Sequence, residues 1–216
     1  MMMMSRRALL ISGAAVGVGA ALGGWMLLDG GVAVASVATG AQAPAFSVQD
    51  GEGRTRTLAE FSGRTVVLEW TNFGCPYVRK HYDSRNMQTL QQEATGAGVV
   101  WLQVISSAPG EQGHLDGAGA LARVRTDDAH PTATLLDPSG VMGRAYGATN
   151  TPQMFVINAS GAVVYQGAID DRPSARAASL EGANNYVRAA LADVAAGRAV
   201  RTAQTTPYGC SVKYAD

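Results

Sequence analysis

Residues 65–78 read TVVLEWTNFGCPYV, and the rest of the architecture can be built outward from them. The first part, residues 65–70, is a β-branched and nearly continuous apolar run of the kind that is buried on both faces of a sheet. Pro76 then follows Cys75 directly, and proline suits the first position of a helix because its missing N–H would have no partner there. We therefore predict a central strand, a short turn, and one helix from the cysteine to about Gln92.

Strand and helix patterns alternate through the remainder of the chain. A turn signal at residues 50–53 predicts an opening hairpin, and Asn158 to Gly161 predicts an antiparallel hairpin near the end of the sheet. These patterns indicate an α/β fold, with a central mixed sheet flanked by helices on both faces, an N-terminal hairpin and a C-terminal tail. The predicted strands cover residues 46–48, 54–57, 98–105, 132–136, 153–157 and 162–165, and short helices are expected through 121–124, over 140–146 and within 174–198.

The first 43 residues are predicted to be a targeting segment rather than part of the folded domain. Arg6 and Arg7 precede an uncharged run from Ala8 to Leu28, which is the order of an export signal and resembles the twin-arginine type. An ordinary Sec signal is the alternative. The run is also long enough to cross a bilayer, so a retained N-terminal anchor plus linker stays open, although small residues favour cleavage near Ser36.

This reading predicts three parts: the signal or anchor over residues 1–43, one domain over 44–198, and a tail over 199–216 that carries the second cysteine. The working domain is then expected to be exported, in the periplasm or otherwise outside the cytoplasm. A tether to the inner membrane follows only if the N-terminal segment is retained.

Composition excludes several classes of protein. Apolar residues make up 47% and charged residues 16% of the chain, which supports a packed core and excludes a disordered protein. Seventeen basic and seventeen acidic residues cancel, so the electrostatic footprint of a nucleic-acid-binding protein is missing. Two cysteines are too few for a cysteine-only zinc site, and we expect no metal and no other cofactor.

Cys75 is the residue best placed for chemistry. At a helix N-terminus, unpaired backbone N–H groups and the helix dipole favour an anion. Arg79, Lys80 and His81 add positive charge within the next turn and a half. Together they are expected to lower the thiol pKa and to hold Cys75 as a thiolate. The alternative is that Cys75 is a small buried apolar residue, as many free cysteines are.

Four stretches, taken in order, resemble the thioredoxin superfamily, and within it the peroxiredoxin-like redoxins related to alkyl hydroperoxide reductase and thiol-specific antioxidant proteins. They are residues 43–46 (APAF), 72–78 (NFGCPYV), 150–152 (NTP) and 209–214 (GCSVKY), and the resemblance covers about Gly40 to Tyr214. It implies a thioredoxin-like fold and an antioxidant or thiol oxidoreductase activity, with Cys75 as the nucleophile.

The same resemblance implies further site residues. Thr151 and Pro152 should be joined by a cis peptide bond, in a loop that faces the cysteine and shapes a substrate groove together with Asn72 and Pro76. Cys210 should meet Cys75, in the same chain or in a neighbouring one.

If the two cysteines meet, the Cys75 thiolate attacks a peroxide or a substrate disulfide, and Cys210 resolves the product. An external thiol reductant, such as a thioredoxin-like protein, must then regenerate the pair. Two alternatives stay open. The chain could be a non-enzymatic binding module stapled by a structural Cys75–Cys210 disulfide, or it could be a redox sensor.

Glu69 lies six residues before Cys75, where thioredoxins carry a buried acid that helps to move protons. Burial in a strand should raise the pKa of such a carboxyl group through desolvation. Two roles are therefore kept for Glu69, a proton relay and a surface-facing or paired structural carboxylate.

The chain departs from its relatives in several places. Val78 stands where a thioredoxin has its second cysteine, and Leu68 and Asn72 stand where typical peroxiredoxins have proline and threonine, which puts fast peroxide reduction in doubt. Copper-delivery relatives also carry a second cysteine near the first, so a copper site at Cys75 and His81 is disfavoured.

Two groups of charged residues are left without a catalytic role. The motif does not select a catalytic arginine among Arg79, Arg123, Arg125 and Arg144. Residues 170–172 (DDR) are interpreted as a salt-bridged or helix-capping cluster rather than as a metal or substrate site.

Overall fold

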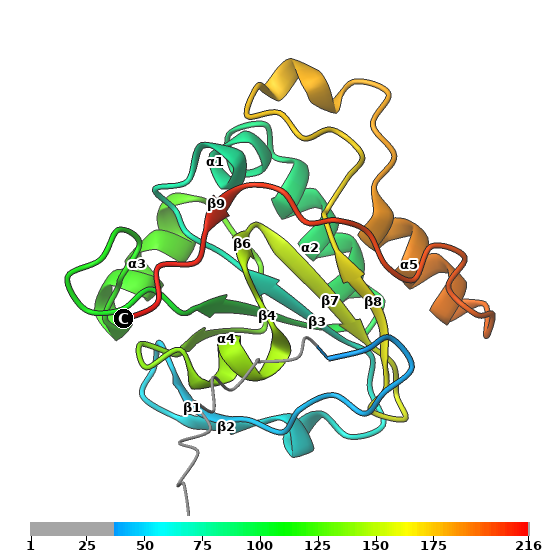
Figure 1. Cartoon of the computed structure of the whole chain (residues 1–216), viewed down its shortest axis with the longest axis horizontal. Helices are drawn as coiled ribbons and strands as arrows, with labels where there is room; N and C mark the ends of the chain where they lie inside the picture. The colour runs from blue at the N-terminus through cyan, green and yellow to red at the C-terminus, as the bar shows by residue number, and fades with distance from the viewer. Residues whose placement is uncertain (1–36, 216) are drawn as a thin grey trace, which may run out of the picture. The chain divides into compact units, whose positions relative to one another are not determined.

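The computed structural model describes residues 37–215 of the chain (Figure 1). The predicted export signal up to residue 36, with its cleavage site near Ser36, lies outside the described residues. Among residues 37–215, no helix combines the length and apolar character that a membrane span requires.

Within residues 37–215, seven strands form one mixed sheet in the order β2-β1-β5-β4-β3-β7-β8. The predicted central strand is β3 (Val66–Trp70), which pairs in parallel with β4 (Val100–Ile105) and antiparallel with β7 (Gln153–Ile157). The predicted opening and closing hairpins are both present, and the α/β fold class is confirmed. The other strands are β1 (Ser47–Asp50), β2 (Thr55–Thr57), β5 (Ala133–Leu136) and β8 (Val163–Gly167).

Helices cover both faces of this sheet, because side chains on β3 point alternately to two apolar layers. Val67 packs in the layer formed with α1, α2, α3 and α5, whereas Leu68 and Trp70 pack in the layer formed with α4 (Figure 1). The helices are α1 (Pro76–Asp83), α2 (Asn86–Gly96), α3 (Gly117–Thr126), α4 (Val141–Tyr146) and α5 (Tyr186–Ala195), with short 3₁₀ turns η1 (Leu58–Phe61) and η2 (Ala177–Leu180).

The structure divides one predicted helix in two and confines another to the second half of its predicted segment. The helix expected from Pro76 to Gln92 is two helices, because Arg85 takes a left-handed conformation with φ 63° that a right-handed helix cannot contain. The closing helix expected within residues 174–198 begins at Tyr186. There the Asn185 side chain caps it by accepting the N–H of Arg188 at 2.8 Å.

The C-terminal tail folds back across the domain (Figure 1). We call residues 204–215 the strap. Its short strand β9 (Cys210–Ser211) pairs antiparallel with β6 (Asn150–Thr151). Near its end, the Tyr214 hydroxyl donates to the carbonyl oxygen of Ala148 at 2.7 Å. The tail therefore docks on its own chain.

Candidate active site

Cys75 occupies the N-cap position of α1, at the turn after the central strand. Its backbone is extended, and Pro76 fills the first helical position as predicted. The side chain has no exposed surface. In its thiol form, Cys75 Sγ donates to the carbonyl oxygen of Thr151 at 3.1 Å. The peptide bond between Thr151 and Pro152 is cis, as the resemblance implied, and this loop lies against the cysteine.

The strap brings Cys210 onto Cys75. In the β6–β9 pair, Cys210 is the direct partner of Thr151, whose carbonyl oxygen contacts Cys75 Sγ. Both cysteines are free thiols. The disulfide expected for this pair is therefore not formed, although the side chains of the two cysteines interact.

The two thiols have opposite acidities. Burial raises the pKa of Cys75, but hydrogen bonds from the Cys210 thiol, and from the backbone N–H groups of Val78, Cys210 and Tyr77, outweigh it and hold that pKa below its usual 9.0. For Cys210, burial and the donation to Cys75 raise the pKa to about 11. Cys75 is therefore the thiol that loses its proton first, and Cys210 is the one that keeps it.

The cations expected to stabilise this thiolate are engaged elsewhere. Arg79 pairs with carboxylates at Asp83 and Asp127. Burial, followed by the charge of Lys80, lowers the pKa of His81 to about 3, so this imidazole is neutral at pH 7. Backbone and thiol hydrogen bonds, rather than side-chain charge, carry the effect.

Gly209 permits the close approach of the strap. Its φ is +130°, and a Cβ at this position would lie 2.0 Å from the carbonyl oxygen of Thr151. We expect Gly209→Ala to push Cys210 away from Cys75, to raise the pKa of Cys75, and to slow disulfide formation by about a hundredfold. Thiolate absorbance followed against pH measures the change in the Cys75 pKa.

Gly182→Ala is the matched control, since Gly182 also has a positive φ, 65°, but a Cβ there meets nothing within 4 Å. An unchanged Cys75 pKa in Gly209→Ala would contradict this account of the strap.

Asn72 holds two loops together beside the cysteine. Its amide oxygen accepts the N–H of Gly74 at 2.9 Å, and its amide nitrogen donates to the carbonyl oxygen of Gln112 at 3.1 Å. The side chain is buried. Its contacts are therefore with backbone, and its contribution to a substrate groove stays a prediction.

Glu69 is fully buried among hydrogen-bond donors. Its carboxylate accepts from Tyr82 Oη at 2.6 Å, from Trp101 Nε1 at 2.7 Å and from Gln91 Nε2 at 3.0 Å. Desolvation raises its pKa to about 7 despite these bonds. The raised pKa agrees with the effect expected of burial, and the carboxylate is paired rather than surface-facing. The proton-relay role stays a prediction.

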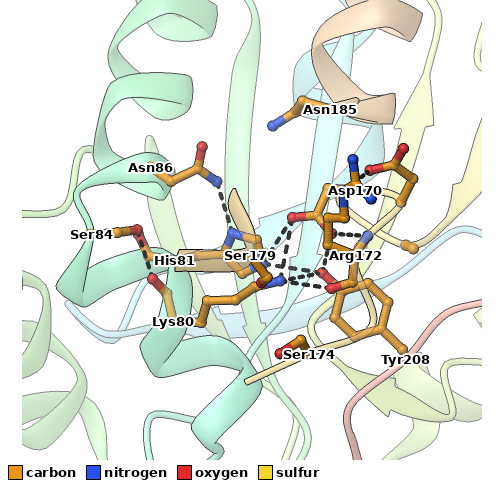
Figure 2. Close-up of polar contacts among 12 residues, drawn as sticks. Lys80, His81, Ser84, Asn86, Asp170, Arg172, Ser174, Ser179, Asn185 and Tyr208 are labelled. Atoms are coloured by element: carbon orange, nitrogen blue, oxygen red, sulfur yellow. Dashed lines mark hydrogen bonds and ion pairs between the residues drawn. The ribbon is translucent and has the colours of Figure 1, made fainter. Parts of the chain in front are cut away.

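A second buried cluster touches the strap, and no sequence pattern had indicated it. Figure 2 shows Lys80 and His81 of α1 pointing toward Asp170, which follows β8, and toward Tyr208 of the strap. The salt-bridged interpretation of residues 170–172 agrees with this contact. Lys80, the ion-pair partner of Asp170, is remote in sequence, so no local pattern could have predicted the pair.

A mixed sheet with flanking helices, a cysteine that opens the helix after the central strand, and a cis-proline loop against that cysteine define a thiol-based redoxin of the thioredoxin fold. The chain belongs to the AhpC/TSA family, whose model matches residues 39–166. The family match thus includes Cys75 and Pro152 and ends before Cys210. The chain is a redox enzyme in this general sense.

Solved structures support the same fold. A hypothetical protein from Sinorhizobium meliloti 1021 is 26% identical with a TM-score of 0.69, over 84% of this chain and 97% of that one. An uncharacterized conserved protein from Geobacillus kaustophilus is 24% identical with a TM-score of 0.70, over 82% and 93% of the two chains. A putative thiol:disulfide interchange protein DsbE from Chlorobium tepidum is 24% identical with a TM-score of 0.50, over 61% and 85%. A search of curated protein sequences found no relative.

Proposed function

We propose that this protein is a thiol–disulfide oxidoreductase in which Cys75 is the nucleophile and Cys210 of the same chain is the resolving thiol. The observation that carries the proposal is the docked strap, in which Cys210 pairs with Thr151, the residue whose carbonyl oxygen contacts Cys75 Sγ. One thiol of lowered pKa beside one of raised pKa is the arrangement that a two-step exchange needs.

In the first step, the Cys75 thiolate attacks one sulfur of a substrate disulfide. The substrate S–S bond breaks, one substrate thiolate leaves, and a mixed disulfide forms at Cys75. Cys75 has no exposed surface, so a substrate reaches it only when the strap segment around Cys210 moves aside.

In the second step, Cys210 attacks the Cys75 sulfur. The mixed disulfide breaks, the proton of Cys210 passes to the departing substrate thiolate, and a Cys75–Cys210 disulfide remains. The substrate is reduced by two electrons, and an external thiol reductant restores both cysteines.

A disulfide fits this site better than a peroxide does. With a peroxide, Cys75 would become a sulfenic acid, and Cys210 would then expel water. Donors to the peroxide oxygens would be needed, but the Asn72 amide contacts loop backbone, Arg79 and Arg123 bind Asp127, and Arg144 donates to carbonyl oxygens. We therefore propose disulfide exchange as the main activity and slow peroxide reduction.

The proposed location follows from the sequence of residues 1–43 and is outside the cytoplasm. Disulfides persist in that compartment, so substrates with disulfide bonds would be present there. The proposed cycle also requires a thiol reductant in the same compartment. Membrane attachment would follow from retention of the N-terminal segment.

The deciding experiment mixes the reduced full chain with oxidised glutathione and, separately, with hydrogen peroxide, and follows intact mass. Glutathione disulfide is expected to convert the wild type rapidly to a form lighter by two hydrogens. Cys210→Ser should stop with one glutathione bound at Cys75, because nothing resolves the mixed disulfide. Peroxide should act more slowly.

Resolution by Cys210 would be refuted if Cys210→Ser released glutathione as fast as the wild type does. Oxidation that is faster with peroxide than with glutathione disulfide would overturn the preference for disulfides and leave the two cysteine roles intact.

A further inference from the structure

A buried charged cluster lies beside the reacting cysteines and is not needed for their chemistry. The side chains of Lys80 and Asp170 are 0% and 1% exposed. Burying a charge is costly unless it is paired and hydrogen-bonded, so such a cluster calls for a physical explanation.

Each N–H group of Lys80 Nζ has an acceptor, and one of the three acceptors belongs to the strap. Lys80 Nζ donates to the carbonyl oxygen of Arg172 at 2.9 Å, to Tyr208 Oη at 3.0 Å and to Asp170 Oδ2 at 3.4 Å (Figure 2). The Tyr208 hydroxyl in turn donates to Asp170 Oδ1. Tyr208 therefore bridges the two charges, and the ammonium lies 5.0 Å from the centroid of its ring.

His81 completes the cluster as a neutral group. Its Nδ1 accepts from the Asn86 amide at 2.8 Å, which assigns the proton to Nε2. That nitrogen lies 3.4 Å from Tyr208 Oη and 3.8 Å from Asp170 Oδ2. The cluster is thus one buried cation and one buried anion, joined through a phenol of the strap.

The cluster connects the segments that carry the two cysteines. Lys80 lies five residues after Cys75 on α1, and Tyr208 lies two residues before Cys210 on the strap. The ring of Tyr208 also packs against that of Tyr77 in the first turn of α1, with centroids 5.9 Å apart. Helix and strap are therefore held in register close to the thiol pair.

We propose that Lys80 and Asp170 are positioning residues that hold Tyr208 and thereby place the Cys210 thiol on Cys75. The inference rests on the proposed roles of the two cysteines. On this view, the Tyr208 end of the strap stays anchored while the segment around Cys210 moves aside for a substrate and then returns in the same register.

A purely structural cluster would stabilise the fold without affecting the encounter of the thiols, and the two cases can be separated. The full-length dithiol is equilibrated with glutathione and glutathione disulfide, so that each protein disulfide formed reduces one glutathione disulfide to two glutathiones. The equilibrium constant of this exchange reports the effective concentration of the Cys210 thiol at Cys75. The pKa of Cys75, followed by thiolate absorbance, is the second readout.

Tyr208→Phe keeps the ring and removes the bridging hydroxyl. We expect it to lower the equilibrium constant for the disulfide by about tenfold and to raise the Cys75 pKa, because Cys210 donates less often. Lys80→Met should act in the same direction. The double variant should lose little more than the larger single effect, since both changes remove one contact.

Tyr146→Phe is the matched control, because the Tyr146 hydroxyl makes a partly buried hydrogen bond, at 2.7 Å to the carbonyl oxygen of Pro44, that is separate from the Lys80–Asp170–Tyr208 cluster. It should lower the melting temperature and leave both readouts unchanged. The proposal is overturned if Tyr208→Phe lowers stability as Tyr146→Phe does and changes neither readout. Failure of the cysteine roles would appear separately, as disulfide exchange that survives in Cys75→Ser.

Discussion

Cys75→Ser is expected to abolish thiol–disulfide turnover, with a loss of about a thousandfold or more. The serine hydroxyl cannot form the mixed disulfide. Cys210 cannot replace Cys75, because the backbone N–H groups at the start of α1 that lower the thiol pKa are directed at position 75. Reduction of insulin disulfides with dithiothreitol as the electron source measures the effect.

The same variant also tests the coupling of the two thiols. Without the Cys75 thiolate as an acceptor, the pKa of Cys210 should fall toward its usual 9.0, which alkylation rates against pH would report. Cys210→Ser is the control, because it retains the first attack. Undiminished turnover in Cys75→Ser would show that another group is the nucleophile.

Glu69→Gln is expected to change the pH dependence of stability. The carboxyl pKa is about 7 in the folded protein, against an ordinary value of 4.5. The native state therefore binds more protons than the unfolded state between pH 4.5 and 7, and the contribution of Glu69 to stability falls as the pH rises through that window. A shift of this size corresponds to about 3 kcal/mol.

Urea unfolding of both proteins from pH 4 to pH 8 provides the measurement. Relative to wild type, the free energy of unfolding of Glu69→Gln should rise by about 3 kcal/mol across that range. The difference isolates Glu69, because His81 is present in both proteins. Its pKa of about 3 makes stability increase with pH up to about 6.5. A difference that does not change with pH would show that Glu69 titrates normally.

The sheet and the position of Cys75 could be predicted because local patterns determine them. The apolar run of β3 and the Cys75–Pro76 pair each carry their own physical reason. The break between α1 and α2 could not be predicted in the same way. The position holds arginine rather than the glycine or proline that signals a helix end, and arginine rarely takes the left-handed conformation found there.

The electrostatics of the site show the same limit. Lys80 and Arg79 follow Cys75 closely, which suggested that their charges stabilise the thiolate. Lys80 pairs with Asp170 and Arg79 pairs with Asp127, which lie 90 and 48 residues away in sequence, and Arg79 also pairs with the nearby Asp83. These carboxylates, rather than the thiolate, bind the two cations. In contrast, the meeting of Cys210 with Cys75 followed from a resemblance and not from any spacing.

Docking of the strap on its own chain determines the molecularity of the proposed second step. Attack by Cys210 on a Cys75 mixed disulfide is a first-order reaction, because both sulfurs belong to one molecule. Its half-time should therefore be independent of protein concentration. At a low protein concentration, the mixed disulfide would therefore be resolved as fast as at a high one. Only the first attack on the substrate and the later reaction with the reductant would depend on concentration.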